Sequence, residues 1–354
     1  MKRYGNLYPK MCAMENIRVA HEAARKGKSH YREVLMVNAD TDSYLVQIRD
    51  MLVNKTFQNA PYRVFEKIDQ RKNRVIHKLP YFPDRIVHHA IVQVLEPIWM
   101  AGFIPDTLAC IKGRGIHAGV KKIKRALHAD PEGTRYCLKM DVRKFYPTMD
   151  HDILLGILAK RIKDPNVMWL LNEIIRSTPS PGLPIGNYLS QYFGNVYLSG
   201  LDHQIKEQMQ CRHYWRYCDD MVILDGDKTR LHRLRCDIVQ ALTDIKLEMK
   251  DDWQVFPVAD RGLDFMGYRF FPGYTLLRKS TVQQFKRAMR RLKKYWRRMQ
   301  PITVVSTVMS YYGWMKHANC LHLWLSHVDS EVRRIVAVVC AAANIRNPLT
   351  RRYA

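Results

Sequence analysis

Residues 212–227 place two adjacent aspartates at the tip of a predicted β-hairpin, and this feature most constrains the fold. Aromatic and β-branched side chains fill both flanks, and Gly226 closes the second one. Asp219 and Asp220 stand where the two strands meet. Neighbouring carboxylates repel each other and are costly beside apolar walls, and a bound divalent cation would relieve that cost. Two solvated aspartates at an ordinary turn would give the same sequence. The hairpin alone therefore does not decide between a metal site and a solvated turn.

A second stretch lies upstream and favours the metal-binding interpretation. Residues 136–141 have the pattern of a buried strand that ends on Asp141 and continues into aromatic residues. A strand-end aspartate together with an Asp-Asp hairpin is the smallest set that can hold two Mg²⁺ ions about 4 Å apart. Such ions stabilise the attacking and leaving oxygens of a phosphoryl transfer. Asp141, Asp219 and Asp220 therefore contain the minimum set for a two-metal site.

The net charge narrows the class of partner. The 354 residues contain 58 Lys and Arg against 33 Asp and Glu, which gives a net charge of +25. A charge of this size repels itself unless a polyanion is usually bound, and nucleic acid is the simplest polyanion. A membrane surface is the rival, but a compact basic amphipathic anchor with two attachment signals is missing. The 47% apolar fraction is typical of a globular protein, and the length favours two or three subdomains.

The cysteines and the apolar runs predict a soluble intracellular protein. The eight cysteines form no Cys-X-X-Cys pair and have no paired His spacing, so neither a zinc ribbon nor a disulfide framework is expected. The longest apolar run, residues 335–343, is too short to cross a bilayer. A reducing cytoplasm is the default compartment for such a chain.

Apolar periodicity predicts the elements of the first third of the chain. Helical spacing runs through residues 11–30, ending near Gly27, and again through residues 42–54. Residues 62–79 alternate instead, which predicts a basic β-hairpin with a polar turn at residues 69–73.

Two further helices have clear sequence patterns. One is expected to begin after Asp84, as its N-cap, and to run toward Trp99. The other covers residues 278–298, which contain ten Lys or Arg, no acid and an apolar stripe. Ten uncompensated charges are unfavourable unless phosphates lie nearby, so this helix is predicted to face nucleic acid. A merely solvated face would give the same pattern.

Three motifs, in order along the chain, resemble those of reverse transcriptases. Tyr217-Cys218-Asp219-Asp220 resembles their Tyr-X-Asp-Asp box, residues 141–146 resemble their first metal-binding motif, and residues 182–191 resemble the loop-to-helix motif under the incoming nucleotide. The resemblance implies an α+β right-hand polymerase fold with fingers, an antiparallel-sheet palm and a small helical thumb. It places the fingers at residues 1–135, the palm at 136–275 with a fingers-associated insertion around 155–180, and the thumb at 276–354.

The resemblance also assigns roles at the metal site. Asp141, Asp219 and the main-chain carbonyl of Val142 would hold two Mg²⁺ ions, with Mn²⁺ as an alternative. Asp220 would be the more peripheral carboxylate. Lys250 would donate a proton to pyrophosphate, although the two aspartates that follow it disturb the family pattern. These roles imply an RNA-directed DNA polymerase that binds RNA and DNA.

Other residues would bind the nucleotide and the primer. Tyr146 matches the bulky residue that excludes a 2′-hydroxyl, which predicts deoxynucleotide substrates, although its ring could simply pack the palm. Lys72 and Arg74 in the basic hairpin would neutralise the triphosphate, with a solvated charge run as the alternative. The nucleotide would also meet Ile185, Gly186 and Gln191. The turn that grips the primer end would consist of Phe265, Met266, Gly267 and Tyr268.

A departure at residues 185–187 narrows the resemblance. Retroviral and intron enzymes usually have Gln-Gly there, whereas Ile-Gly-Asn followed by Ser190-Gln191 resembles diversity-generating retroelement reverse transcriptases. The resemblance implies mutagenic retrohoming, in which a template-repeat RNA is copied with errors at adenines and the cDNA replaces a variable region. An apolar Ile185 cannot donate the hydrogen bonds of a Gln, so discrimination at the template base would weaken.

The family resemblance implies specific partners and a compartment. The partners would be template RNA, the cDNA/RNA hybrid, dNTPs, a structured retroelement RNA and a small, basic, oligomeric accessory helical-barrel protein, with no membrane. The compartment would be the cytoplasm of a bacterial, phage or archaeal host cell. No DNA-binding, endonuclease or ribonuclease H domain is expected after the thumb.

Other functions compete with this interpretation. A retron-type or phage-defence reverse transcriptase has the same chemistry, and neighbouring template and variable repeats that differ at adenines would separate the two. A non-catalytic RNA-binding scaffold is a rival from another class, but it conflicts with the retention of all three aspartates and Tyr146. An intron maturase fits less well, because its DNA-targeting extension is not expected here.

Overall fold

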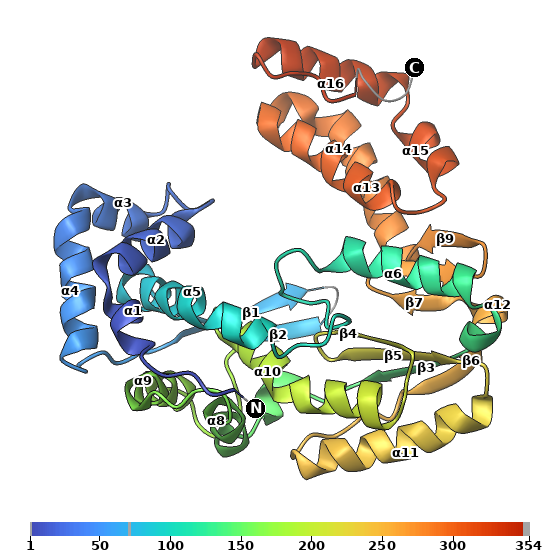
Figure 1. Ribbon diagram of the computed structural model, residues 1–354. Helices are drawn as coiled ribbons and strands as arrows, with labels where there is room; N and C mark the ends of the chain where they lie inside the picture. The colour runs from blue at the N-terminus through green and yellow to red at the C-terminus, as the bar shows by residue number, and fades with distance from the viewer. Residues whose placement is uncertain (1, 70–71, 350–354) are drawn as a thin grey trace. The chain divides into compact units, whose positions relative to one another are not determined.

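The chain folds into two compact units of mixed helices and sheets (Figure 1). The computed structural model describes residues 2–69 and 72–349. Within those ranges no helix is long and apolar enough to cross a bilayer. The first unit comprises Met1–Gly113, Lys139–Val222 and His232–Trp253, and the second comprises Arg114–Leu138, Ile223–Leu231 and Gln254–Ala354.

The first unit contains a cluster of five helices, four before the β1–β2 hairpin and one after it (Figure 1). Helix α2 packs against α4 and α5, and α4 is capped by Asp40, whose side chain accepts a hydrogen bond from the main-chain N of Ser43 (3.4 Å). The apolar faces predicted over residues 11–30 and 42–54 are buried, so both helices are confirmed. Periodicity missed α1 and α3, because they are too short to show a repeating pattern. The bounds are α1 (Tyr8–Cys12), α2 (Met14–Arg25), α3 (Arg32–Ala39), α4 (Thr41–Val53) and α5 (Ile86–Met100).

A long antiparallel hairpin follows α4, as predicted over residues 62–79. Its strands are β1 (Arg63–Asp69) and β2 (Lys72–Lys78), paired in register along their whole length. Of the polar turn predicted at residues 69–73, Asp69, Lys72 and Asn73 belong to the strands, and residues 70–71 lie outside the described residues. At the other end, the main-chain N of His77 donates to the carbonyl of Ile185 (2.8 Å), which ties the hairpin to the 182–191 loop.

Asp84 lies in a π-helical turn, η1 (Tyr81–Arg85), and does not cap α5. Its side chain is fully buried, and Oδ1 accepts a hydrogen bond from the main-chain N of Ala60 (3.0 Å). The N-cap prediction is therefore wrong. An Asp before an apolar run has the same sequence pattern whether it caps that helix or binds a distant segment. Burial raises the pKa of Asp84 to about 6.

An Asp84→Asn variant should change how stability depends on pH. The folded protein keeps this proton up to about pH 6, whereas the unfolded chain releases it near pH 4. Between those values the folded state binds more protons, so the stability of the parent falls as pH rises. The free energy of unfolding of the variant should therefore rise relative to the parent by up to about 3 kcal/mol between pH 4 and pH 7.5. Urea unfolding at several pH values measures this difference. The control is Asp42→Asn, which removes an exposed carboxylate. If the difference in free energy of unfolding between Asp84→Asn and the parent stays constant with pH, the prediction is wrong.

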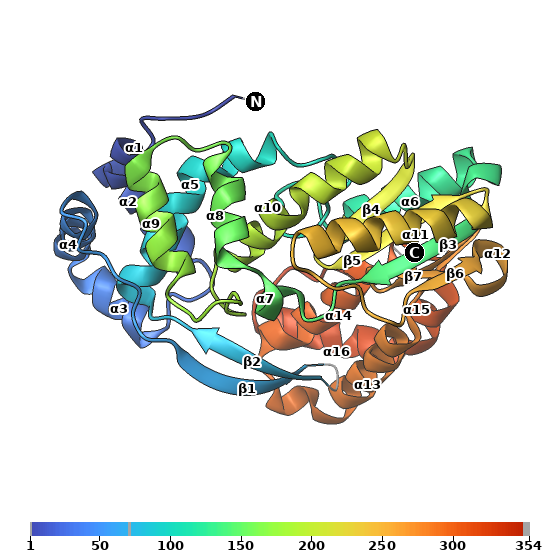
Figure 2. The same cartoon turned by 90° about the horizontal axis from the view of Figure 1, so that it is seen from below.

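A four-stranded sheet has the order β4-β5-β3-β6. Strands β4 and β5 are joined by a two-residue turn, which makes them the antiparallel hairpin predicted over residues 212–227. The chain passes between its two units within β3 and β5. In the first unit α8 lies beside α9 and α10 (Figure 2). The bounds are β3 (Tyr136–Asp141), β4 (His213–Tyr217), β5 (Asp220–Asp225), β6 (Gln254–Pro257), α7 (Phe145–Thr148), α8 (His151–Ala159), α9 (Pro165–Ile175), α10 (Ser190–His203), η3 (Gln204–Gln208) and α11 (Lys228–Asp244).

The second unit combines a three-stranded antiparallel sheet, in the order β7-β8-β9, with a group of helices. Helix α6 packs on β8, and α13, α14 and α16 pack together (Figure 2). The bounds are α6 (Ile116–Ala129), η2 (Glu132–Thr134), α12 (Val258–Arg261), β7 (Leu263–Phe265), β8 (Tyr268–Phe271), β9 (Tyr274–Leu277), α13 (Lys279–Tyr295), η4 (Trp296–Arg298), α14 (Pro301–Met315), α15 (Leu321–His327) and α16 (Ser330–Ala342).

Helix α13 has the amphipathic character predicted for residues 278–298. Phe285, Met289 and Leu292 are buried along one face. The prediction that all ten cations lack a counter-charge is wrong, because Lys293 forms ion pairs with acidic side chains at the start of α16. The acidic side chains that pair with Lys293 are distant from it in sequence, so residues 278–298 considered by themselves could not reveal these ion pairs.

Candidate active site

The turn between β4 and β5 carries the adjacent aspartates. Cys218 has a φ of +56°, in the left-handed region that residues other than glycine rarely adopt. Asp219 completes the turn, and Asp220 is the first residue of β5. Such a backbone conformation persists only where surrounding contacts hold it, so the position of the aspartates depends on what packs around the turn.

Asp141 ends β3, the strand next to β5, so the structure brings the three predicted aspartates together. Burial, followed by the negative charge of Asp141, raises the pKa of the Asp219 carboxyl to about 6. The charge of Asp220 acts in the same direction. Like charges held close together in a partly buried site are what a cation would relieve.

Lys250 lies against Asp141. Its ammonium group forms an ion pair with the Asp141 carboxylate, and its main-chain N donates to the carbonyl of Asp141 (2.9 Å). Burial alone would lower the pKa of Lys250, but the hydrogen bond and charge of Asp141 raise it above its usual value. The buried Val142 pairs through its main chain with Met249. The predicted proton donor therefore balances part of the charge of the aspartates.

The donor set suits a hard divalent cation. Carboxylate oxygens are the ligands that Mg²⁺ and Mn²⁺ prefer, and the Oδ1 atom of Asp141 is buried with no hydrogen-bond partner within the described ranges. Among residues 2–69 and 72–349, no group of three or more His, Cys, Asp or Glu side chains is already arranged to hold a metal ion. The ammonium group of Lys250 and a metal ion would compete for Asp141. The residues fit the metal chemically, provided that Lys250 moves.

Arg143 is a residue that the sequence patterns did not identify. It forms an ion pair with Glu248 (3.3 Å) and a second one with Asp251, and its main-chain N donates to the carbonyl of Glu248 (2.7 Å). These contacts attach the segment that carries Lys250 to the end of β3. Asp251 is one of the two aspartates that depart from the family pattern, so this departure itself was the available signal.

Tyr146 lies in the short helix α7, close to the turn. Burial raises the pKa of its phenol well above the usual value, and the charge of Asp219 adds to this effect. Its carbonyl accepts a hydrogen bond from the main-chain N of Leu183 (2.8 Å), which connects α7 to the 182–191 loop. A Cβ at Gly194 of α10 would lie 3.4 Å from the Tyr146 ring, an ordinary van der Waals distance, and 3.1 Å from the Phe145 ring, so both rings of α7 lie against this part of α10.

The β1–β2 hairpin constrains the conformation of the 182–191 loop. Gly186 has a φ of +121°, and a Cβ there would lie 2.5 Å from the carbonyl oxygen of His77, so only glycine fits. Ile185 beside it is half-buried, and Gln191 is exposed in the first turn of α10. The three predicted nucleotide contacts of this loop thus belong to one short, constrained segment.

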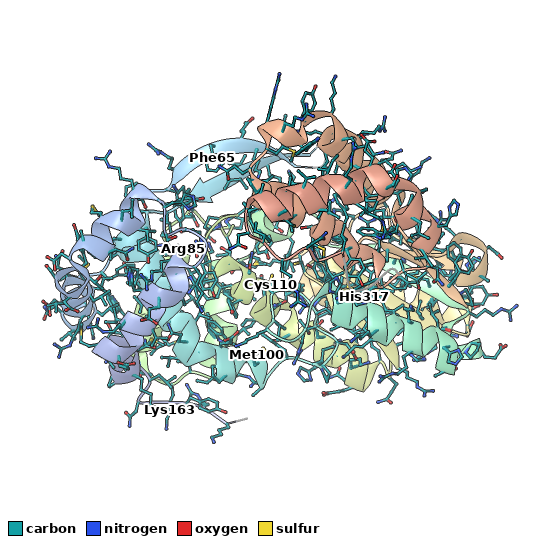
Figure 3. The ribbon with its side chains drawn as sticks, turned by 90° about the horizontal axis from the view of Figure 1, so that it is seen from above. Phe65, Arg85, Met100, Cys110, Lys163 and His317 are labelled. Atoms are coloured by element: carbon teal, nitrogen blue, oxygen red, sulfur yellow. The ribbon has the colours of Figure 1, made fainter. Side chains whose placement is uncertain are left out.

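A cavity adjoins Gly186 and was not anticipated from the sequence. Its lining includes three cationic and three aromatic side chains, Lys28, Lys78, Arg85, Tyr31, Tyr81 and Tyr188. Arg85, labelled in Figure 3, lies 5.7 Å over the ring of Tyr188, and His89 stacks on that ring at 4.1 Å. Cations and ring faces of this kind suit phosphates and bases. The segments that meet here are distant in sequence, so no sequence pattern showed that they would line one cavity.

The hairpin residues predicted to bind the triphosphate are only partly located. Arg74 lies on β2 opposite Lys67, and both side chains are exposed. The side chain of Lys72 lies outside the described residues. Phe65, labelled on β1 in Figure 3, is also exposed, so this hairpin presents basic and apolar groups together.

The predicted primer-grip turn lies in the second unit. Met266 (φ +50°) and Gly267 (φ +82°) form the two-residue turn between Phe265 and Tyr268, which are paired across β7 and β8. A Cβ at Gly267 would lie 2.7 Å from the ring of Trp314, and Tyr268 Oη donates to the Trp314 carbonyl (2.9 Å). The turn is therefore held against α14.

The fold and these residues define a class of protein. A mixed fold with an Asp-Asp hairpin beside a strand-end aspartate is typical of polymerases that transfer nucleotides with two metal ions. Residues 65–270, more than half of the chain, match the family described as "Reverse transcriptase (RNA-dependent DNA polymerase)". The chain belongs to the reverse transcriptase family of RNA-directed DNA polymerases. The predicted right-hand polymerase fold and the predicted enzyme class are thereby confirmed.

Known proteins show how far the similarity extends. Protein YkfC of Escherichia coli (strain K12) is 25% identical over 266 residues, which is 63% of this chain and 70% of that protein. Group II intron-encoded protein LtrA of Lactococcus lactis subsp. cremoris is 25% identical over 173 residues, 46% of this chain and 28% of that protein. The structure of apo telomerase from Candida tropicalis has a TM-score of 0.52 at 12% identity, covering 81% of this chain and 59% of that one. That likeness concerns the fold alone, and this chain spans only a minor part of LtrA.

Proposed function

We propose that this reverse transcriptase makes error-prone cDNA, with errors at template adenines, for mutagenic retrohoming in a diversity-generating retroelement. An RNA copy of a template repeat would be reverse transcribed, and the cDNA would replace a variable region of a target gene. The observation that carries the proposal is the apolar Ile185 in a loop held by the His77 hydrogen bond (2.8 Å). A side chain that offers no hydrogen bond at the nascent pair weakens discrimination there.

The aspartates are the proposed metal ligands. Asp141, Asp219 and the Val142 carbonyl would hold two Mg²⁺ ions, or Mn²⁺ in their place, with Asp220 more peripheral. When bound, the ions would lower the pKa of the primer 3′-hydroxyl and stabilise charge on the pyrophosphate. Lys250 would then leave Asp141, and we assign to it the transfer of a proton to pyrophosphate.

The remaining predicted residues would bind the substrates. Tyr146 would exclude the 2′-hydroxyl of a ribonucleotide, and Lys72 and Arg74 would neutralise the triphosphate. Ile185, Gly186 and Gln191 would also contact the nucleotide. The primer end would be held by Phe265, Met266, Gly267 and Tyr268.

Charge and family similarity support the proposed partners. The net charge of +25 and the cationic cavity at Gly186 suit template RNA, the cDNA/RNA hybrid and dNTPs. The retroelement assignment adds a structured RNA and a small basic accessory protein, in the cytoplasm of a bacterial, phage or archaeal host cell. The fingers, palm and thumb are proposed at residues 1–135, 136–275 and 276–354.

Primer extension on an adenine-containing RNA template, with Mg²⁺ and dNTPs, tests the function. Sequencing of the cDNA should show errors clustered opposite adenines. Accurate cDNA would contradict the mutagenic function and favour a reverse transcriptase of the retron-type, defence or intron-encoded class. No Mg²⁺-dependent synthesis would favour the RNA-binding scaffold.

Ile185→Gln should reduce misincorporation opposite template adenine by about tenfold, because a hydrogen-bonding side chain at the pair restores discrimination. Sequencing of cDNA from parent and variant gives the two error frequencies. Ile185→Val, which keeps an apolar side chain of similar shape, should keep the parent's frequency. An unchanged frequency in Ile185→Gln would remove this explanation of the errors.

An intron-encoded reverse transcriptase is the second candidate, favoured by the 25% identity to LtrA over 173 residues. An enzyme that copies its own intron must preserve that sequence. Accurate copying of adenines would therefore favour this candidate, and the same sequencing experiment separates the two functions.

A further inference from the structure

A buried ion pair lies beneath the catalytic turn, between Arg216 of β4 and Asp202 of α10. Both side chains are 0% exposed. Arg216 donates from Nε to Oδ1 (2.8 Å) and from Nη2 to Oδ2 (2.6 Å) of Asp202. Asp202 also accepts hydrogen bonds from Tyr214 Oη (2.7 Å) and Thr107 Oγ1 (2.9 Å). The two-point contact fixes the plane of the guanidinium group, and the carboxylate is satisfied at both oxygens.

The third nitrogen of Arg216 reaches the turn itself. Nη1 donates to the carbonyl of Cys218 (2.9 Å) and to Asn195 Oδ1 (3.1 Å). Cys218 has a φ of +56° and directly precedes Asp219. A hydrogen bond to its carbonyl fixes the peptide plane that joins Cys218 to Asp219. The direction in which the Asp219 side chain leaves the backbone therefore depends on Nη1.

Neighbouring segments of the first unit hold Arg216 in place. Its main-chain N donates to the main-chain carbonyl of Asp106 (3.1 Å), and its own carbonyl accepts from the main-chain N of Leu108 (2.9 Å). Asn195 Nδ2 donates to the carbonyl of Ala109 (2.9 Å), just before Cys110, which is labelled in Figure 3. Strand β4, helix α10 and the 106–109 loop thus position the guanidinium group together.

Stability alone is a weak reason for this arrangement. Burying an ion pair costs desolvation, and apolar side chains of similar volume often stabilise a core at least as well. No apolar side chain could donate to the Cys218 carbonyl. We propose that Arg216 is a positioning residue, which orients Asp219 for metal binding and nucleotidyl transfer. The proposal deepens the proposed function and rests on the role given there to Asp219.

Arg216→Lys tests the proposal, because it keeps a charge opposite Asp202 but cannot reproduce the Nη1 bond. The kcat of primer extension should fall about tenfold, with the KM for primer–template unchanged. The affinity of the nucleic-acid-free protein for Mn²⁺, measured by electron paramagnetic resonance of unbound Mn²⁺, should also fall. Tyr214→Phe is the matched control, since it removes one hydrogen bond to Asp202 and none to the turn. It should leave kcat and Mn²⁺ affinity unchanged.

A double variant separates positioning from folding. Arg216→Met with Asp202→Leu removes both charges at similar volume, so the variant should still unfold in one cooperative thermal transition while kcat and Mn²⁺ affinity fall. Full kcat and Mn²⁺ affinity in this variant would overturn the proposal. Equal losses of kcat and Mn²⁺ affinity in Arg216→Lys and Tyr214→Phe would also overturn it. So would a result in which both Arg216 variants unfold while Tyr214→Phe stays folded. A parent that cannot extend a primer would count against the proposed function, and Mn²⁺ affinity would still report on positioning.

Discussion

Asp219→Asn is expected to slow primer extension by about a thousandfold, because metal ions at this site should contribute several kcal/mol to the transition state. The same substitution should not destabilise the fold. Burial and the charge of Asp141 raise the pKa of Asp219 to about 6, so at pH 7.5 the folded protein holds an ionised group that it disfavours. Asparagine removes that charge, and the midpoint of thermal unfolding should stay equal or rise.

Single-turnover extension and a thermal unfolding curve measure the two effects of Asp219→Asn. Asp251→Asn is the matched control, because this carboxylate is exposed and pairs with Arg143 close to the same site. It should retain most of the activity. An Asp219→Asn protein that extended primers at nearly the parent's rate would rule out the two-metal assignment. Loss of both activity and fold would show instead that Asp219 acts in folding.

Features encoded by neighbouring residues could be predicted from the sequence. The hairpin at residues 212–227 has strand-forming residues on both sides of a polar tip, and the strand ending on Asp141 has the same local pattern. Their juxtaposition followed from family resemblance, because no local pattern tells which strands become neighbours in a sheet. The hairpin at residues 62–79 and the helices at 11–30 and 42–54 also depend on periodicity alone.

Contacts between distant segments could not be predicted in the same way. Asp84 binds the main chain of Ala60 instead of capping α5, and Lys250 pairs with Asp141 from another segment. Arg216 offered one unused signal. An Arg within a strand of aromatic residues is expected to be buried, and a buried charge requires a partner. The sequence could therefore have predicted that an acid lies opposite Arg216, but not that the acid is Asp202.

The ring of Tyr146 has a defined position, as a steric gate requires. It packs against the ring of Phe145, with centroids 5.2 Å apart, and against Gly194 of α10. Its carbonyl accepts a hydrogen bond from the main-chain N of Leu183 (2.8 Å), which fixes the backbone of α7 relative to the 182–191 loop. A rigid ring at this place can exclude a substrate atom by bulk alone.

Tyr146→Ala should therefore raise the ratio of kcat/KM for ribonucleotides to that for deoxynucleotides by roughly 10- to 100-fold. A steric clash of roughly 1–3 kcal/mol corresponds to this factor. The ratio is taken within one protein, so any loss of stability from the truncation cancels. Tyr146→Phe keeps the ring and should keep the parent's ratio. If Tyr146→Ala incorporates ribonucleotides no better than the parent, the ring only packs α7 against α10. If Tyr146→Phe also admits them, the hydroxyl group carries the discrimination instead of the bulk of the ring.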